Sequence, residues 1–286
     1  MDQKLTYLLK LLDDDSPEVK SAILKEILAY GPALEYHLSQ LGAAVSEEQR
    51  TLLKDLLGEH ARVSIKSRWR ECFKEKSEVA QIENALQLIA EFQNGPNYPY
   101  RLKKMLDELT KEFEQHIFQD IDPVKLADFI FKTKHFRGVN GLDYYNPSNS
   151  NLVYCLENRC GIPISLSLIF ILVGARLGME IEGCNFPGHF LARFYADEKM
   201  ILVDGYNSGR FLDEESIFEM NPNLPEVVRE VLKERATSCQ IIMRVLHNLI
   251  KAYEETKQKD NSELMVELLE ETEAIARENL EDPPSF

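Results

Sequence analysis

Apolar residues recur at helical spacing through the first part of the chain. Leu5, Leu8 and Leu12 fall three and four positions apart, which places them on one face of a helix. Ser16 and Pro17 then form a helix start signal, because serine caps the first turn and proline suits its first position. The same periodicity predicts further helices within 46–60, 77–92, 99–113 and 122–131.

The pattern changes at residues 138–149, which are dense in Gly, Asn, Pro and Ser. This composition is typical of an irregular surface segment, and Asn149 or Ser150 can cap the helix that follows. The elements expected next are a helix over 152–158, a buried helix over 163–177, strands near 180–184, 189–195 and 200–204, a turn-rich segment, and helices from Pro225 onward. The order predicts an α+β fold, mostly helical, with a buried helix packed on a small antiparallel sheet.

Composition and charge narrow the class of protein. The formal net charge of −15 argues against nucleic acid and anionic membrane surfaces, since both need clustered Lys and Arg. The apolar run at 162–175 is too short to span a bilayer, and MDQKLTYLLKLLDDD carries charges where a signal peptide needs an apolar core. Five scattered cysteines do not make a disulfide framework. A reduced, cytoplasmic protein is expected.

Candidate chemistry gathers around His189, in the stretch NFPGHFLARF. Pro187 and Gly188 form a turn into a strand, so the imidazole is held rigidly and can still meet solvent. Asp204 ends the next strand, and a hydrogen bond between the two side chains would fix the imidazole tautomer. A cysteine at the start of the preceding helix would complete a thiol triad, because a helix N-terminus lowers a thiol pKa and its N–H groups can hold an oxyanion.

Three stretches carry a resemblance to a known family: YYNPSNSNLVYCLENRCGIPISLSLIFILVGARLG, GCNFPGHFLARF and ILVDGYNSGRFL, covering about 144–212. In this order they resemble the transglutaminase-like superfamily of the papain-like cysteine protease fold, and within it the bacterial SirB-type branch. That branch tends to carry a tetratricopeptide-like tail, which residues 241–255 are similar to. The first pair of helices is itself similar to HEAT-type repeats, and NGPNYP at 94–99 is a candidate linker, so a HEAT-like N-terminal helical region is expected over 1–95. The family resemblance implies a transglutaminase-like core over 99–220 and a tetratricopeptide-like C-terminal region over 225–286.

The resemblance departs from the family at the nucleophile. Catalytic transglutaminases place their cysteine at the position that this chain fills with Pro163, whereas His189 and Asp204 fall on the family's histidine and acid. Cys160 lies three residues earlier and could reach His189 if the joint into the helix is a loop; otherwise it is a partly buried thiol in a turn. Ser165 could reach the same cleft, although a serine here is more often a local hydrogen-bonder.

The remaining cleft candidates are binding or structural residues. Asn149, Ser150 and Asn151 are expected to form caps or Asx-turns before the helix over 152–158, and Gly188 to shape the turn before His189. Arg159 has three alternative partners: Asp204, Glu157 or a ligand carboxylate. No C-x₂-C or H-x₃-H pair is present, so neither a metal nor a cofactor is expected.

Three functional hypotheses follow. The first is a transglutaminase-like pseudoenzyme that has lost its catalytic cysteine and acts as a cytoplasmic binding or regulatory protein for a peptide or protein partner. The second is a cysteine hydrolase or acyltransferase, of peptidase or amidase type, using Cys160, His189 and Asp204. The third is a plain helical adaptor in which the cleft has no role. An enzyme needs an ionised, accessible thiol at Cys160, whereas a binding protein does not.

Overall fold

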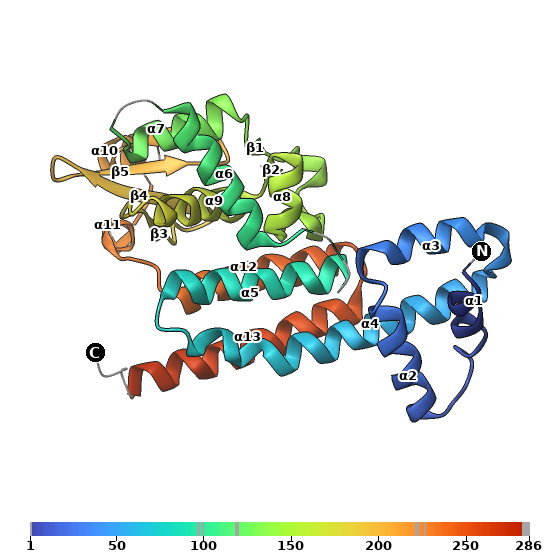
Figure 1. Ribbon diagram of the computed structural model, residues 1–286. Helices are drawn as coiled ribbons and strands as arrows, with labels where there is room; N and C mark the ends of the chain where they lie inside the picture. The colour runs from blue at the N-terminus through green and yellow to red at the C-terminus, as the bar shows by residue number, and fades with distance from the viewer. Residues whose placement is uncertain are drawn as a thin grey trace. The chain divides into compact units, whose positions relative to one another are not determined.

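The computed structural model describes residues 2–95, 98, 100–117, 120–220, 223–225 and 227–281. These residues divide into two compact units: a first unit of Met1–Arg68 with Leu88–Arg101, and a second unit of Trp69–Gln87 with Leu102–Phe286. The described chain is mostly helical and carries two small sheets, both within the second unit (Figure 1). The expected α+β class is confirmed.

The first unit packs its helices around a core of leucine and isoleucine side chains. Leu5, Ile27 and Leu34 are at most 3% exposed in this core. Ser16 caps the second helix, its Oγ accepting from the backbone N–H of Val19. The elements are α1 (Gln3–Lys10), α2 (Pro17–Leu28), η1 (Gly31–Ala33), α3 (Leu34–Leu41), η2 (Gly42–Ala44), α4 (Glu47–Trp69) up to Arg68, and the end of α5 (Glu78–Asn94).

The helices that precede the sheet in the second unit differ in detail from the sequence prediction. They are η3 (Arg70–Lys74), the first part of α5, α6 (Leu102–His116), α7 (Pro123–Ala127) and the π-helical turn η4 (Asp128–Thr133). The helix expected from about Pro99 begins at Leu102, whose N–H donates to Gln87 Oε1 at 2.7 Å. Pro99 itself lies outside the described residues. The helix expected to reach Phe131 changes to π geometry at Asp128, which apolar spacing does not signal.

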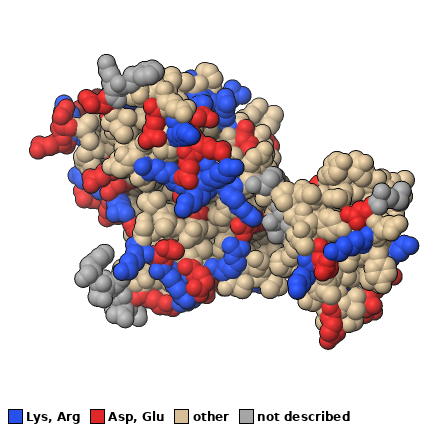
Figure 2. All heavy atoms as spheres, viewed as in Figure 1, with Lys and Arg blue, Asp and Glu red and all other residues tan. Residues whose placement is uncertain are grey.

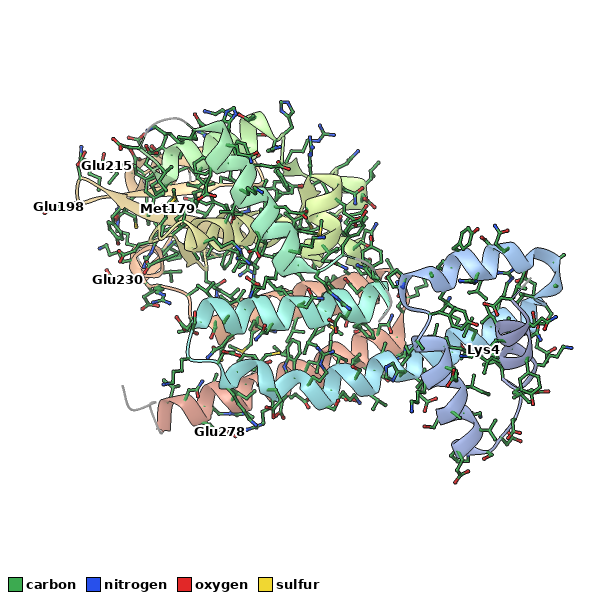
Figure 3. All side chains as sticks on the ribbon, viewed as in Figure 1. Lys4, Met179, Glu198, Glu215, Glu230 and Glu278 are labelled. Carbon is green, nitrogen blue, oxygen red and sulfur yellow. The ribbon has the colours of Figure 1, made fainter. Side chains whose placement is uncertain are left out.

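A four-stranded antiparallel sheet lies in the second unit, with the strand order β3-β4-β5-β6. Its strands are β3 (Glu182–Cys184), β4 (Leu191–Ala196), β5 (Lys199–Asp204) and β6 (Arg210–Leu212). Asp197 and Glu198 turn the β4–β5 hairpin with φ values of 48° and 64°, as a two-residue hairpin loop requires (Glu198 is labelled in Figure 3). Strand β6 lies where the sequence predicted only turns.

The expected buried helix is α9 (Pro163–Arg176), in which every residue from Pro163 to Gly174 is buried. It packs against the sheet, and Ser167 Oγ donates to the Phe190 carbonyl at 3.2 Å. At its C-terminal end Arg176 donates to carboxylates of Glu83 and Asp107, each at 2.7 Å. These contacts hold the helix against the sheet and fix its C-terminal end.

A short helix, α8 (Leu152–Asn158), leads into α9. Around it lie the turns η5 (Gly141–Asp143) and η6 (Pro147–Ser150) and the parallel strand pair β1 (Arg137–Gly138) and β2 (Cys160–Gly161). Of the three residues expected to form caps or Asx-turns, Asn149 and Ser150 belong to η6 and do not cap α8. The cap is Asn151, whose Oδ1 accepts from the N–H groups of Val153 and Tyr154.

The C-terminal part is helical, with α10 (Glu214–Met220), α11 (Val227–Lys233), α12 (Ser238–Glu255) and α13 (Lys259–Glu281). Helices α12 and α13 lie side by side as a hairpin (Figure 1). The buried indole of Trp69 donates to Thr272 Oγ1 of α13 at 3.0 Å. Nearby, Arg70 donates to Glu271 and to Glu278, which is labelled in Figure 3.

Candidate functional site

His189 is held by a turn at the entrance to β4. Gly188 has φ +74°, a backbone conformation that suits glycine, and the His189 N–H donates to the Phe186 carbonyl at 3.1 Å. This turn extends through His189, so the strand expected from residue 189 starts only at Leu191. The imidazole is 23% exposed, so it can meet a ligand while its backbone is fixed.

Asp204, the last residue of β5, lies against the imidazole. Its Oδ1 is 2.8 Å from His189 Nε2, and Asn207 donates from its backbone N–H to Oδ1 and from Nδ2 to Oδ2. Burial acts to raise the pKa of Asp204, but the hydrogen bonds from His189 and Asn207 outweigh it and hold the pKa below its ordinary value. In the tautomer in which His189 Nε2–H donates to Asp204, the other ring nitrogen, Nδ1, is the hydrogen-bond acceptor.

Tyr206 lies beside this pair. Its ring stands perpendicular to the His189 ring with centroids 6.3 Å apart, and its hydroxyl donates to the Val139 carbonyl at 2.8 Å. A Cβ on Gly138 would lie 2.6 Å from the Tyr206 ring, so only glycine fits there. Tyr206 was not predicted as a site residue, although its place two residues after Asp204 was the available signal.

The first turn of α9 lies beside the same pair. Pro163 is the first residue of the helix and is buried. One turn later Ser167 contacts the carbonyl of Phe190, the residue after His189. A Cβ on Gly205, the residue after Asp204, would lie 3.1 Å from Leu166 Cβ. Leu166 and Ser167 near the start of α9 therefore pack against Gly205 and Phe190, the residues that directly follow Asp204 and His189.

Cys160 lies in a strand, so the loop on which its reach toward His189 depended is not present. Its strand β2 pairs with β1. The Arg137 N–H donates to the Arg159 carbonyl at 3.1 Å, and the Val139 N–H donates to the Gly161 carbonyl at 3.2 Å. Burial raises the pKa of the Cys160 thiol above its ordinary value; the Arg137 charge opposes this in part and the Asp143 charge adds to it. The thiol is half-buried and predominantly protonated at neutral pH.

Ser165 and Asn149 hold the segment before α8 against α9. Ser165 Oγ donates to the Asn149 carbonyl at 2.7 Å, and Asn149 Nδ2 donates to the Asp143 and Tyr144 carbonyls. Both side chains are about 1% exposed. In the structure these two residues make local packing and hydrogen-bonding contacts.

Arg159 ends α8 in the left-handed conformation, at φ 53°, and its side chain is exposed. Within the described chain, the Asp204 carboxylate accepts from His189 and Asn207 and forms no ion pair with Arg159. The structure therefore brings His189, Asp204 and the start of α9 together and leaves Arg159 outside that group.

Two features of the described residues bear on partners. In the part of the chain that the structure describes, no helix is both long and apolar enough to cross a membrane, and no cluster of three or more His, Cys, Asp or Glu side chains could hold a metal ion. On the face drawn in Figure 2, Lys and Arg lie among Asp and Glu rather than apart from them.

Comparison with known proteins defines the class. Residues 100–247 match the family model described as the transglutaminase-like superfamily, and the chain belongs to that superfamily. It is 33% identical over 181 residues to a UPF0162 protein of Xylella fastidiosa strain 9a5c, covering 58% of this chain and 63% of that protein. It is also 26% identical over 184 residues to F-box only protein 21 of Mus musculus, covering 60% of this chain and 28% of that protein.

The aligned region thus spans less than two thirds of the length of either relative. No solved structure matches the chain.

Proposed function

We propose that this chain is a transglutaminase-like protein in which Pro163 replaces the catalytic thiol, and that it binds a peptide or protein partner in the cytoplasm in a regulatory role. The observation that carries the proposal is the position of Pro163. It is the first residue of the buried helix that faces the His189–Asp204 pair, where the superfamily's nucleophile is expected. Proline has no nucleophilic atom to offer there.

The state of Cys160 supports the same proposal against the rival thiol hydrolase. A working nucleophile needs a depressed thiol pKa and freedom to approach the base. Burial raises the pKa of the Cys160 thiol, and pairing of β2 with β1 fixes its backbone. Both observations disfavour a triad of Cys160, His189 and Asp204.

The surface around His189 has groups suited to a peptide. His189 offers a polar ring atom, and Tyr206 lies beside it. The Tyr144 ring lies 6.2 Å from that of Tyr206 and 5.4 Å from that of Tyr145, which is 46% exposed. Aromatic side chains next to a fixed hydrogen-bonding group are frequent anchors in protein interfaces.

Iodoacetamide labelling across pH tests the loss of catalysis. Cys160 is half-buried, whereas Cys72, Cys155, Cys184 and Cys239 are buried, so labelling of native protein reports chiefly on Cys160. We expect slow labelling with a midpoint above the ordinary thiol pKa of about 8.5. Cys160→Ser should abolish the signal and His189→Ala should leave its midpoint unchanged. Rapid labelling at pH 6 that depends on His189 would support the hydrolase instead.

Partner capture with matched variants tests the binding role. We expect His189→Ala and Tyr206→Ala to reduce capture of a partner that the wild-type chain retains. Cys160→Ser and Leu142→Ala, the latter at a 98% exposed loop position, are the controls. Equal capture by all four variants would favour the plain helical adaptor.

We also propose that the chain belongs to the SirB-type branch and keeps the three-part organisation of 1–95, 99–220 and 225–286. The α12–α13 hairpin supports a tetratricopeptide-like tail, because such repeats are helical hairpins. Separate expression of 69–286, which keeps the contact of Trp69 with Thr272, and of 69–224 tests this part. The longer fragment should fold cooperatively, and loss of 225–286 should expose the surface of the core on which α12 lies.

A further inference from the structure

We propose that the surface beside His189 binds a peptide that carries a carboxylate, and that Arg244 of α12 is the residue that recognises this carboxylate. The inference rests on the proposed peptide-binding function and names the chemistry of the partner. Arg244 and His189 both belong to the second unit, and both are half-buried, so each offers part of its side chain to a ligand.

Arg244 is anchored to the turn that holds His189. Its Nη1 donates to Asn185 Oδ1 at 3.0 Å, and Asn185 is half-buried. The next residue, Phe186, accepts at its carbonyl from the His189 N–H at 3.1 Å. The guanidinium therefore lies at the start of the turn whose end carries the imidazole.

Two tyrosines connect Arg244 to His189 by a second route. The Tyr206 ring lies 6.3 Å from the His189 ring and 6.2 Å from the Tyr144 ring. Burial raises the pKa of the Tyr144 phenol above its ordinary value, and the Arg244 charge opposes this in part, so the guanidinium lies near that phenol. Helix α12 also packs against η6, the turn that follows Tyr144 in the chain. These contacts join one continuous surface, the Arg244 surface, which consists of Arg244, Asn185, His189, Tyr206 and Tyr144.

The charge of Arg244 is not balanced by an acid. Within the described residues Arg244 forms no ion pair, and the amide of Asn185 carries no charge. The Asp204 carboxylate is 8% exposed and accepts hydrogen bonds from His189 and Asn207. A positive charge is therefore left for a ligand in a chain whose net charge is −15.

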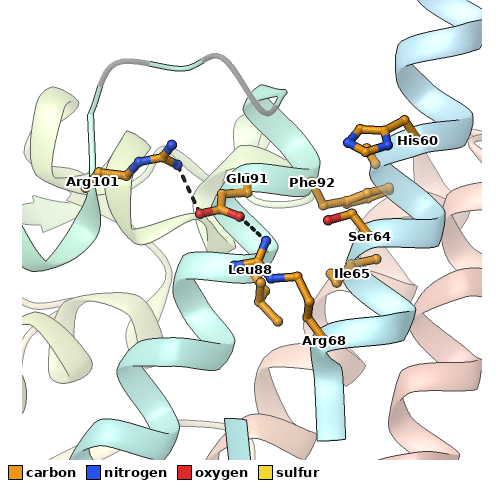
Figure 4. A pocket seen from close by; sticks show the side chains of 9 residues that line it. His60, Ser64, Ile65, Arg68, Leu88, Glu91, Phe92 and Arg101 are labelled. Carbon is orange, nitrogen blue, oxygen red and sulfur yellow. Dashed lines mark hydrogen bonds and ion pairs between the residues drawn. The ribbon is translucent and has the colours of Figure 1, made fainter. Parts of the chain in front are cut away.

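Arginines of the first unit differ from Arg244 in this respect. Arg68 and Arg101 line a cavity there, and both donate to the Glu91 carboxylate, at 2.7 Å and 3.0 Å (Figure 4). A guanidinium presents five N–H donors in a plane whose geometry matches a carboxylate. At Arg244 the matching carboxylate has to come from a partner.

The other residues of the Arg244 surface suit a peptide better than a free anion. In the tautomer in which His189 Nε2–H donates to Asp204, Nδ1 can accept from a peptide N–H. Tyr144 and Tyr206 are half-buried, so each ring leaves part of its surface for an apolar side chain. The surface therefore fits a peptide with a carboxylate close to an apolar side chain.

Titration of the full chain with short peptides, followed by NMR, tests the inference. The probes are acetyl-Phe-Ala-Glu-Ala-amide, its neutral analogue acetyl-Phe-Ala-Gln-Ala-amide, and the same analogue with a free C-terminal carboxylate. We expect at least one acidic probe to bind saturably and at least about tenfold more tightly than the neutral probe. The tighter of the two acidic probes distinguishes a side-chain carboxylate from a C-terminal one.

Variants assign the preference to Arg244. Arg244→Gln should weaken the acidic probe about tenfold and leave the neutral probe unchanged, which also shows that the variant is folded. His189→Ala and Tyr206→Ala should weaken acidic and neutral probes alike. Arg50→Gln is the matched control, because Arg50 belongs to the first unit and pairs with Glu47, and its loss changes the net charge equally. It should change acidic-probe binding by less than about twofold.

The outcomes separate this inference from the proposed function. Equal affinity for acidic and neutral probes, or an acid preference that survives Arg244→Gln, would overturn the inference. If His189→Ala and Tyr206→Ala still weakened the neutral probe in that case, the peptide-binding function would stand without a carboxylate preference. No saturable binding of either acidic probe would also overturn the inference, and the proposed function would then be decided by partner capture.

Discussion

Truncation of Leu172 tests whether α9 is the packed centre of the second unit. Leu172 is 0% exposed, and α9 is buried on all sides from Pro163 to Gly174, so its surroundings have little room to collapse into the space left by Leu172→Ala. Buried Leu-to-Ala changes cost roughly 2–5 kcal/mol, and the enclosed position places the expected loss at about 3–5 kcal/mol. At a urea dependence of about 2 kcal/mol/M, the midpoint should fall by about 1.5–2.5 M.

The assay is urea unfolding followed by tryptophan fluorescence. Trp69 is the only tryptophan, is 1% exposed and belongs to the same compact unit as α9, so its emission reports on the relevant part of the chain. Leu142→Ala is the control at a 98% exposed leucine and should change stability by less than about 0.5 kcal/mol. If Leu172→Ala lowers the free energy of unfolding by no more than Leu142→Ala does, α9 is not the packed centre of the second unit.

Two further predictions use the same unfolding assay. Gly138→Ala should destabilise the chain by roughly 1–3 kcal/mol, because the new Cβ would lie 2.6 Å from the Tyr206 ring. Gly141→Ala is the control, because open space surrounds that position, and it should not destabilise the chain. Equal effects of the two substitutions would contradict the close packing of Tyr206. Asp204 has a folded-state pKa below its ordinary 3.8, so its ionised form favours folding above that value, and this contribution is lost as pH falls through the folded pKa. The stability advantage of wild type over Asp204→Asn should therefore shrink as the pH falls below 3.8. An advantage that stays unchanged in acid would contradict the role of the His189 and Asn207 hydrogen bonds in lowering the pKa of Asp204.

Local signals predicted the elements around the site closely. The helix expected over 152–158 is Leu152–Asn158, and the one expected over 163–177 is Pro163–Arg176. Both have start signals and apolar runs that depend on neighbouring residues alone. The pairing of His189 with Asp204 also follows from motif order, and the two side chains lie 2.8 Å apart.

The structural features that could not be predicted from the sequence depend on contacts between distant segments. The two-residue strands β1 and β2 form only because Arg137 and Gly138 meet Cys160 and Gly161. This pairing fixes the backbone of Cys160. Local composition alone could not exclude a loop at Cys160, because the partner strand lies far away in the sequence. The choice of Asn151 as the α8 cap depends on where η6 ends, and three neighbouring Asn and Ser residues fit the same pattern.

The most direct test of the central claim restores a thiol at Pro163. In a Pro163→Cys, Cys160→Ser protein, the new cysteine would occupy the first position of α9, where the helix N-terminus and His189 both favour a thiolate. The measurement is the pH dependence of its ultraviolet thiolate absorbance, which needs no reagent access to the buried position 163, taken as the difference from the Cys160→Ser protein, with and without His189→Ala. We expect a midpoint well below the ordinary thiol pKa of about 8.5, and we expect it to rise when His189 is removed. A midpoint at or above that value, unaffected by His189, would contradict the claim that Pro163 stands where the nucleophile would be.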